Sequence, residues 1–232
     1  MDIIYEDNHI IVCIKPANVL SQADDTQDPD MLTILKSYLK EKYNKPGNVY
    51  LGLLHRLDRP VSGVMIFAKT SKAASRISEQ IKNRHDFSKK YLAVIHGKPE
   101  AEEGEFRDFL HKDKNTNIVK IVCTPNTEAQ KDNAREAILS YKILESIKHE
   151  NQKLSLVSIN LKTGRPHQIR VQFASRKMPL LGDAKYGEDK NTQIALWSES
   201  IELIHPVSCE QIKFAKSPPG VYPWNLFAGF PG

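Results

Sequence analysis

Cysteine is scarce in this sequence. The three cysteines, Cys13, Cys123 and Cys209, are far apart and show no Cys-x-x-Cys spacing. An odd, sparse set of this kind argues against a disulfide framework and against a structural zinc site. It favours cysteines that are buried or have no chemical role, in a reducing compartment. We therefore expect a cytoplasmic protein that holds no metal.

Long apolar segments are missing as well. The longest runs, such as the one from Val61 to Ala68, are far shorter than the roughly 20 residues that a membrane-spanning helix needs. The N-terminus lacks the basic flank and apolar stretch of a signal peptide. A hydrophobic fraction of 40% and a charged fraction of 26% over 232 residues exclude a disordered, collagen-like or coiled-coil chain. We expect a globular protein without a membrane partner.

Positive charge is unevenly distributed along the chain. Eight basic and two acidic residues lie between Lys69 and Lys98, and seven basic and three acidic residues between Lys162 and Lys190. The first fifty residues are acidic on balance, with five basic and eight acidic residues. Such asymmetry fits either a surface that binds a polyanion, most commonly a phosphate backbone, or simply solvated helix faces.

Hydrophobic spacing predicts the secondary structure. We expect helices at 31–39, with Asp30 as the capping residue, at 71–83 and at 167–175, and strands at 3–5, 9–15, 61–67, 91–96, 118–122, 137–144, 154–161 and 197–204. Strands outnumber helices, and helices are scattered between strand pairs, which is typical of an α+β domain on a mainly antiparallel sheet. We predict one domain over 1–232, in which 215–232 is a proline-rich, aromatic tail that either docks on the body or extends a contact with RNA or protein.

The densest polar motif runs from His55 to Gly63, HRLDRPVSG. Arginines on both sides of Asp58 favour an ionised carboxylate, because nearby positive charge lowers a carboxyl pKa. An isolated Asp-Arg pair would more often be an ordinary surface turn. A second dense motif, GRPHQIR at 164–170, favours one site that both motifs form, with His167 and Arg170 three residues apart on one helical face.

Two further motifs complete a recognisable pattern. They are KKYLA at 89–93, where Tyr91 alone would be a half-buried strand tyrosine, and LGDAKYG at 181–187. In this order and at these spacings the four motifs resemble the RluA family of RNA pseudouridine synthases, whose pattern is HRLD-R-x-T/S-G, K-x-Y-x-A, GRxHQIR and LGDxxYG. The resemblance extends from Ile3 to Phe214. Val61 stands where many members have Thr, and Gln172 where many have His.

The resemblance implies a fold and a reaction. The fold is a pseudouridine synthase core, a mainly antiparallel mixed sheet with helices and loops flanking a central cleft. The reaction isomerises uridine in ribosomal or transfer RNA to pseudouridine, with no cofactor and no metal. A stacked uridine is unreachable and must be flipped out of the helix, at a cost of a few kcal/mol. Because the pattern begins at Ile3, we expect no front RNA-binding module, so that the catalytic domain itself holds structured RNA, as a monomer.

The resemblance also assigns roles. Asp58 matches the catalytic aspartate, and attack on the sugar, attack on the ring and proton removal from the sugar all remain open for it. Arg170 matches the arginine that pairs with this carboxylate, Tyr91 the tyrosine that packs on the target base, and Arg56 the arginine that enters the helix where the base leaves. The other expected substrate-binding residues are His55, Arg59, Lys90, Arg165, His167 and Gln168.

Two other functions remain open. A non-catalytic RNA chaperone or ribosome-assembly factor would keep the fold without the reaction. A nucleic-acid glycosidase or nuclease would use Asp58 with a water, but a nuclease usually needs metal-binding carboxylates, and none cluster near Asp58 in the sequence. The sequence leaves open which RNA and which uridine are modified.

Overall fold

The computed structural model describes residues 2–83, 86–113, 115–122, 134–189 and 192–228. The chain divides into two compact units, one formed by residues 1–89 and 197–216 and the other by residues 90–196 and 217–232. Arg84, Cys123 and Lys190 lie outside the described residues. The single domain over 1–232 stays a prediction.

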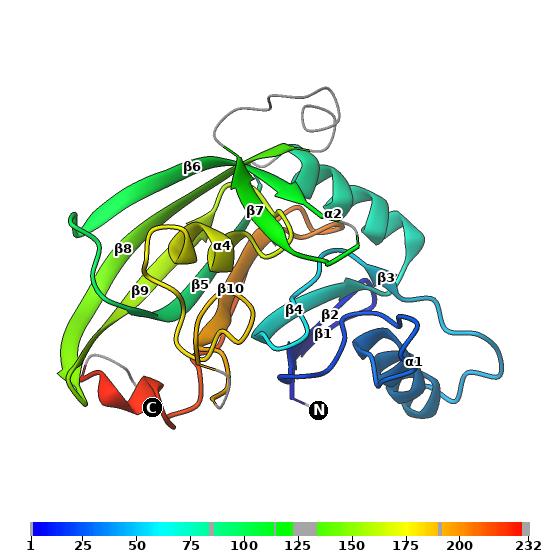
Figure 1. The fold of residues 1–232 in the computed structure, drawn as a ribbon. Coiled ribbons are helices and arrows are strands. Elements are labelled where there is room, and N and C mark those ends of the chain that lie inside the picture. Colours follow the sequence, from blue (N-terminus) through cyan, green and yellow to red (C-terminus); the bar gives the residue numbers. More distant parts are fainter. Residues whose placement is uncertain (1, 84–85, 114, 123–133, 190–191, 229–232) are drawn as a thin grey trace. The chain divides into compact units, whose positions relative to one another are not determined.

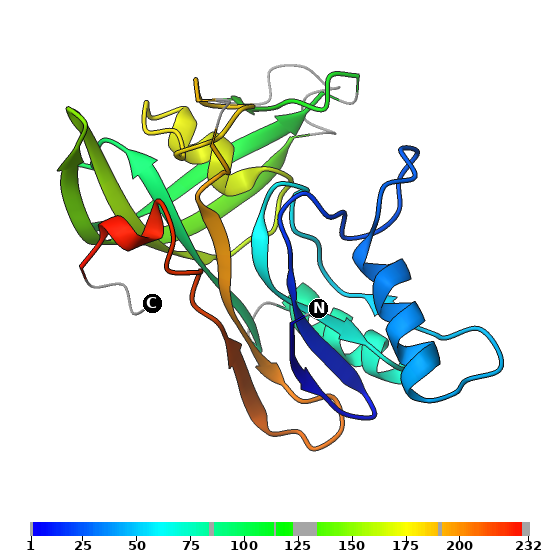
Figure 2. The same cartoon turned by 90° about the horizontal axis from the view of Figure 1, so that it is seen from below.

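The first unit is built on a mixed sheet. Its strands lie in the order β1 (Ile3–Glu6), β2 (Ile10–Lys15), β4 (Ser62–Ala68) and β10 (Leu196–Ile204), with β3 (Gly52–Leu53) beside β4 and β11 (Gln211–Ala215) beside β10. β10 runs parallel to β4, whereas the β1–β2, β2–β4 and β10–β11 pairs are antiparallel. Figure 2 shows β10 and β11 as a long ribbon in orange and brown.

Two helices belong to this unit. Helix α1 (Met31–Lys42) begins where predicted, because the Asp30 side chain accepts a hydrogen bond from the backbone N–H of Thr33 at 3.1 Å. Helix α2 (Ser71–Asn83) has the predicted bounds and packs Ile77 into the core. The core of this unit is formed by apolar residues from both ends of the chain: Ile10, Val12, Val64, Ile66, Ile77, Phe87, Ile201, Leu203 and Phe214.

The second unit is an antiparallel sheet that carries one short helix. The strand order is β5 (Phe87–His96), β9 (Gln152–Leu161), β8 (Arg135–His149), β6 (Glu103–Lys112) and β7 (Val119–Val122), with the first residues of β5 in the first unit. Helix α4 (Gln168–Ala174) lies against this sheet (Figure 1). Phe173 of α4 packs on Phe106 and Tyr141, with ring centroids 5.1 and 6.0 Å away. The predicted α+β class, with a mixed, mostly antiparallel sheet, is confirmed.

Three predictions about the elements were wrong. β6 was missed because only Phe106 and Leu110 of its ten residues are buried, so the apolar positions do not alternate. The strand at 197–204 is not the last, since β11 follows it. The third helix begins at Gln168 and not at His167, whose φ of 51° is left-handed.

From Ser217 on, the described part of the C-terminal tail belongs to the second unit, whereas Ala215 and Lys216 belong to the first. Trp224 is the first residue of a short 3₁₀ turn, η1 (Trp224–Leu226), and Phe227 follows it; they are only 6% and 3% exposed. Tyr222 contacts His149 at the end of β8, with ring centroids 6.2 Å apart. Of the two alternatives for the tail, docking on the body is therefore the one observed.

The close approach of β4 to β10 generates a stability prediction. Gly63 has φ +125°, and a Cβ at this position would overlap the backbone of Ser198 on β10. We expect Gly63→Ala to lower the free energy of unfolding by more than about 2 kcal/mol, because it combines backbone strain with overpacking. Urea unfolding measures the loss.

Gly47 provides the matched control, because a Cβ there would meet nothing within 4 Å. Gly47→Ala is expected to leave the free energy of unfolding within about 0.5 kcal/mol of that of the parent. Equal effects of the two substitutions would contradict the close approach.

Candidate active site

The segment that carries Asp58 lies outside the regular strands and is held at alternate residues. His55 Nε2 accepts a hydrogen bond from the backbone N–H of Ile66 on β4 at 3.2 Å. The backbone of Leu57 exchanges two hydrogen bonds with Ser21 Oγ, at 2.9 and 3.1 Å. His55 and Leu57 are buried, whereas Arg56 is exposed and Asp58 is half-buried. The alternation places the side chains of His55 and Leu57 inside the unit. It leaves Arg56 and Asp58 at the surface side of the segment.

A buried lysine anchors the far side of Asp58. Lys15, at the end of β2, is 0% exposed, and its ammonium donates to the backbone carbonyls of Pro16, Val19 and Arg59 at 2.9, 2.6 and 3.0 Å. Burial lowers the pKa of Lys15 to about 8, while the charge of the Asp58 carboxylate acts in the opposite direction. The backbone is therefore held on both sides of Asp58.

His55 is neutral in the folded protein. Burial lowers its pKa to about 3, and the charge of Lys89 acts in the same direction. Since Nε2 accepts the Ile66 N–H, the proton of the neutral ring is on Nδ1, which is buried and has no hydrogen-bond partner among the described residues. His55 acts on the backbone of the segment and carries no charge toward a phosphate.

Part of the basic stretch at 69–98 is used inside the first unit. Lys69 is 7% exposed at its side chain and pairs with Glu6 at 2.7 Å. Arg76 donates to the backbone carbonyl of Pro206. Outside this stretch, Arg59 pairs with Asp28 at 2.8 Å, and both side chains are partly exposed. The charge count along the sequence therefore overstates the number of cations that a polyanion could meet here.

In the second unit, the last residue of the GRPHQIR motif, Arg170, forms a buried ion pair with Asp183 of the LGDAKYG motif. Arg170 Nε and Nη2 donate to the two carboxylate oxygens of Asp183 at 2.8 and 2.7 Å, and the side chains are 6% and 0% exposed. Burial alone would raise the pKa of Asp183, but the hydrogen bonds and charge of Arg170 hold it below its ordinary value. The two-pronged geometry fixes α4 against the LGDAKYG segment.

Asp183 also orders the residues that follow it. Its Oδ1 accepts the backbone N–H groups of Lys185 and Tyr186 at 3.0 and 3.1 Å. The hydroxyl of Tyr186 lies 2.7 Å from His167 Nδ1 and accepts the backbone N–H of Val119 on β7 at 2.9 Å. His167, Arg170, Asp183 and Tyr186 therefore form one connected network.

The turn before α4 is organised by Gln168. Gln168 Oε1 accepts from Thr163 Oγ1 at 2.8 Å and from the backbone N–H of Arg165 at 3.1 Å. Arg165 Nε donates to the carbonyl of Glu136 at 2.9 Å. His167 lies before the helix, so the shared helical face predicted for His167 and Arg170 is wrong. Tyr186 connects them instead.

Tyr91 and Lys90 are neighbours on β5 with different surroundings. Tyr91 is 4% exposed and pairs across the sheet with Ile159 of β9. Lys90 pairs with Asn160, and both line a broad hollow of about 720 Å³. Successive strand residues face opposite sides of a sheet, so Lys90 does not point the way Tyr91 does.

The structure thus assembles the predicted residues in two groups. His55, Arg56, Asp58 and Arg59 lie on one segment of the first unit, and Lys90, Tyr91, Arg165, His167, Gln168 and Arg170 belong to the second unit. A site that includes both groups stays a prediction. Other residues hold these groups in place and were not assigned a role from the sequence: Lys15, Ser21, Thr163, Asp183 and Tyr186. Only the LGDAKYG motif signalled any of them.

A family model described as RNA pseudouridylate synthase matches residues 9–175, which contain the first three motifs. The chain therefore belongs to the RNA pseudouridylate synthase family, and the resemblance to its RluA members is confirmed. Among the described residues, no helix is long and apolar enough to cross a membrane, and no three His, Cys, Asp or Glu side chains gather as metal ligands.

Individual relatives act on two kinds of RNA by name. The chain is 33% identical over 217 residues to the ribosomal large subunit pseudouridine synthase C of Buchnera aphidicola, covering 88% of this chain and 62% of that protein. It is 32% identical over 195 residues to the tRNA pseudouridine synthase C of Haemophilus ducreyi, covering 81% and 74%. The chain thus spans less than two thirds of the length of some relatives that it matches.

A solved structure supports the fold. The human RNA pseudouridylate synthase domain containing 4 superposes with a TM-score of 0.75 at 22% identity, over 94% of this chain and 88% of that chain.

The buried His55 generates a pH prediction. Its folded pKa of about 3 lies below its ordinary 6.5, so between these values the unfolded chain binds a proton that the folded chain does not. The stability from His55 is complete above pH 6.5 and is lost as pH falls, by about 1.4 kcal/mol per pH unit. In His55→Gln, whose amide oxygen can accept the Ile66 N–H, we expect a shallower loss of unfolding free energy between pH 6 and about 4 than in the parent. Parallel curves would show that His55 titrates normally.

The Arg170–Asp183 pair generates a second stability prediction. Asp183→Asn leaves the buried guanidinium without a counter-charge, and we expect a loss of about 3–5 kcal/mol in the free energy of unfolding at neutral pH. Urea unfolding checks it. The control is Glu136→Gln, which breaks an exposed pair with Arg107 whose side chains are 40% and 58% exposed and should cost less than about 1 kcal/mol. A comparable loss in both variants would disprove the special role of the buried pair.

Proposed function

We propose that this protein is an RNA pseudouridine synthase that isomerises specific uridines in ribosomal or transfer RNA, with Asp58 as its catalytic aspartate. The observation that carries the proposal is the family match over residues 9–175, which includes Asp58, Tyr91 and Arg170 in the family's order. The names of the relatives, which include ribosomal and transfer RNA enzymes, support both RNA classes.

The fixed backbone around Asp58 suits a carboxylate that must meet a reacting nucleotide. Ser21 holds Leu57 on one side, and Lys15 holds the carbonyl of Arg59 on the other, so little conformational freedom is lost when the substrate is bound. Attack on the sugar, attack on the ring and removal of a sugar proton all require this group in its ionised form. During the reaction the bond from the sugar to nitrogen breaks, the uracil rotates, and a bond from the sugar to carbon forms.

We assign the other two catalytic roles by the same family pattern. Tyr91 packs on the target base and assists the proton removal that ends the reaction. Arg170 steadies the catalytic carboxylate, and its orientation is set by the two hydrogen bonds to Asp183. No cofactor or metal enters this scheme.

The remaining motif residues bind the substrate in this proposal. Arg56, which is exposed, enters the RNA helix where the base leaves and offsets part of the cost of flipping. We expect the protein to act as a monomer in the cytoplasm on structured RNA. The residues expected to hold that RNA are Arg59, Lys90, Arg165, His167 and Gln168, and His55 contributes by supporting the Asp58 segment from inside.

Replacement of Asp58 tests the reaction. In cells that lack the gene, carbodiimide labelling of total RNA read by reverse transcription should show one or a few pseudouridines missing. We expect the wild-type gene to restore them and Asp58→Asn to restore none, because the amide keeps the shape but cannot serve as nucleophile or base.

The control for this test is Asp113→Asn, an exposed aspartate after β6 whose side chain accepts the backbone N–H of Asn115 at 2.8 Å, a role that an amide oxygen can also fill. It should restore every site. An unchanged pseudouridine map on deletion, with RNA binding retained, would instead establish a non-catalytic RNA-binding protein. Free base or cut strands in the product would establish a glycosidase or nuclease.

A further inference from the structure

The hairpin formed by β8 and β9 carries two lysines directly opposite each other. Lys148 of β8 pairs in register with Lys153 of β9, two residues from the turn on each strand. Like charges directly opposite on neighbouring strands destabilise a sheet. Both side chains are exposed, and neither forms an ion pair with any residue that the structure describes.

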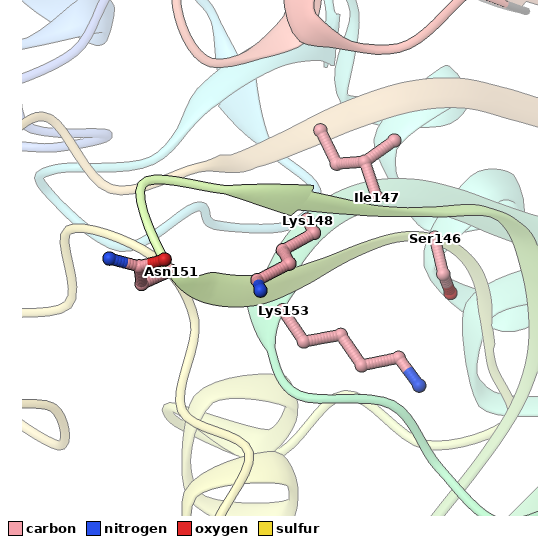
Figure 3. Close-up of a pocket in the computed structure, with 5 residues that line it drawn as sticks. All are labelled: Ser146, Ile147, Lys148, Asn151 and Lys153. Carbon is pink, nitrogen blue, oxygen red and sulfur yellow. The ribbon is translucent and has the colours of Figure 1, made fainter.

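The lysines line a shallow hollow on the hairpin. Its volume is about 310 Å³, and its other lining residues are Ser146, Ile147 and Asn151. Figure 3 shows the Lys148, Lys153 and Ser146 side chains extending to one side of the hairpin, whereas Ile147 extends to the other. The rear of the hollow is rigid, because Ser146 Oγ lies 2.8 Å from Ser155 Oγ, which donates to the carbonyl of Gly97 at 2.7 Å.

The two faces of this hairpin differ in what covers them. His149, next to Lys148 and therefore on the opposite face, contacts Tyr222 of the C-terminal tail. The described part of the tail thus contacts the face away from the lysines, whereas the two lysine side chains are exposed. The cations of the lysine face are presented to solvent with an uncompensated charge.

We propose that the Lys148–Lys153 pair is a phosphate-binding site. It binds the backbone of the RNA substrate at a position remote from the reacting uridine. The two ammonium groups repel each other in the free protein, and a phosphate between them would remove that repulsion and accept hydrogen bonds from both. Asn151 and Ser146 add neutral polar groups at the rim. This inference rests on the proposed function, for which it names a second contact with RNA.

Lys153 lies at one end of β9, and Ile159, the residue opposite Tyr91, lies near the other end. Lys153 and Ile159 are separated by an even number of residues, so their side chains lie on the same face of β9. Lys153 lies six positions before Ile159, which at about 3.3 Å per residue is a distance of about 20 Å. Ser155 and Val157, which lie between them on this face of β9, are 0% exposed, so the lysines would hold the RNA about 20 Å from a base that packs on Tyr91 and not along this face.

Binding measurements on the full-length protein test the site. With a fluorescently labelled structured RNA, we expect Lys148→Gln/Lys153→Gln to weaken affinity roughly tenfold at moderate salt. The slope of log affinity against log salt should fall by about 0.7 to 0.9, as expected for one lost phosphate contact. The matched control, Lys36→Gln/Lys40→Gln, removes two exposed lysines of α1 and should change neither quantity by as much.

A charge reversal separates binding from structure. Lys148→Glu creates an opposite-charge pair with Lys153, so we expect the unfolding midpoint of the free protein to rise while RNA affinity falls. A purely structural role for the lysines would make stability and binding change together. Unchanged affinity and unchanged salt slope in both hairpin variants would overturn the proposal.

A second arm distinguishes the source of the phosphate. If inorganic phosphate raises the unfolding midpoint of the parent but not of Lys148→Gln/Lys153→Gln, while RNA affinity is equal in both, the site takes a free anion and the RNA contact is wrong. Because these are binding measurements, they are independent of Asp58. Loss of RNA affinity without any pseudouridine formation would keep the site and reject the proposed reaction.

Discussion

Arg170 and Asp183 share an ion pair that is almost wholly removed from water, with side chains 6% and 0% exposed. Separating two such charges would leave one of them buried without a counter-charge, so the helix that carries Arg170 and the segment that carries Asp183 must keep their mutual position. Asp183 orders the backbone up to Tyr186, and Tyr186 holds His167 and β7. Four residues of the GRPHQIR and LGDAKYG motifs thus stabilise the fold in addition to any role in RNA binding: His167, Arg170, Asp183 and Tyr186.

In the first unit, one buried cation, Lys15, fixes the backbone next to Asp58. The ammonium of Lys15 is buried, and three backbone carbonyls accept its hydrogen bonds. One of these carbonyls belongs to Arg59, the residue after Asp58. Together with His55 and Ser21, this lysine converts a segment without regular strand pairing into a rigid support for a reactive carboxylate. Such support is what preorganised catalysis requires.

The charges of the chain are divided between structure and binding. Lys69 and Arg170 neutralise buried carboxylates, and Arg76 binds a backbone carbonyl. Lys148 and Lys153, in contrast, face each other at a solvent-exposed position. Count and sign along the sequence do not distinguish these uses, because the distinction depends on which acidic or carbonyl oxygen each cation meets after folding.

The amino-acid sequence by itself determined the α+β class, α1 with its Asp30 cap, the bounds of α2 and the family, because local periodicity, capping and ordered motifs are properties of neighbouring residues. β6 and β11 were missed because only Phe106 and Leu110 of β6 and Phe214 of β11 are buried, and the apolar residues that Leu110 and Phe214 pack against lie mostly in other parts of the chain. The anchoring roles of Lys15, Ser21 and Asp183 required the tertiary structure. Each depends on a contact between segments 13 to 44 residues apart, and no local pattern encodes which distant oxygen or nitrogen a buried polar group will meet.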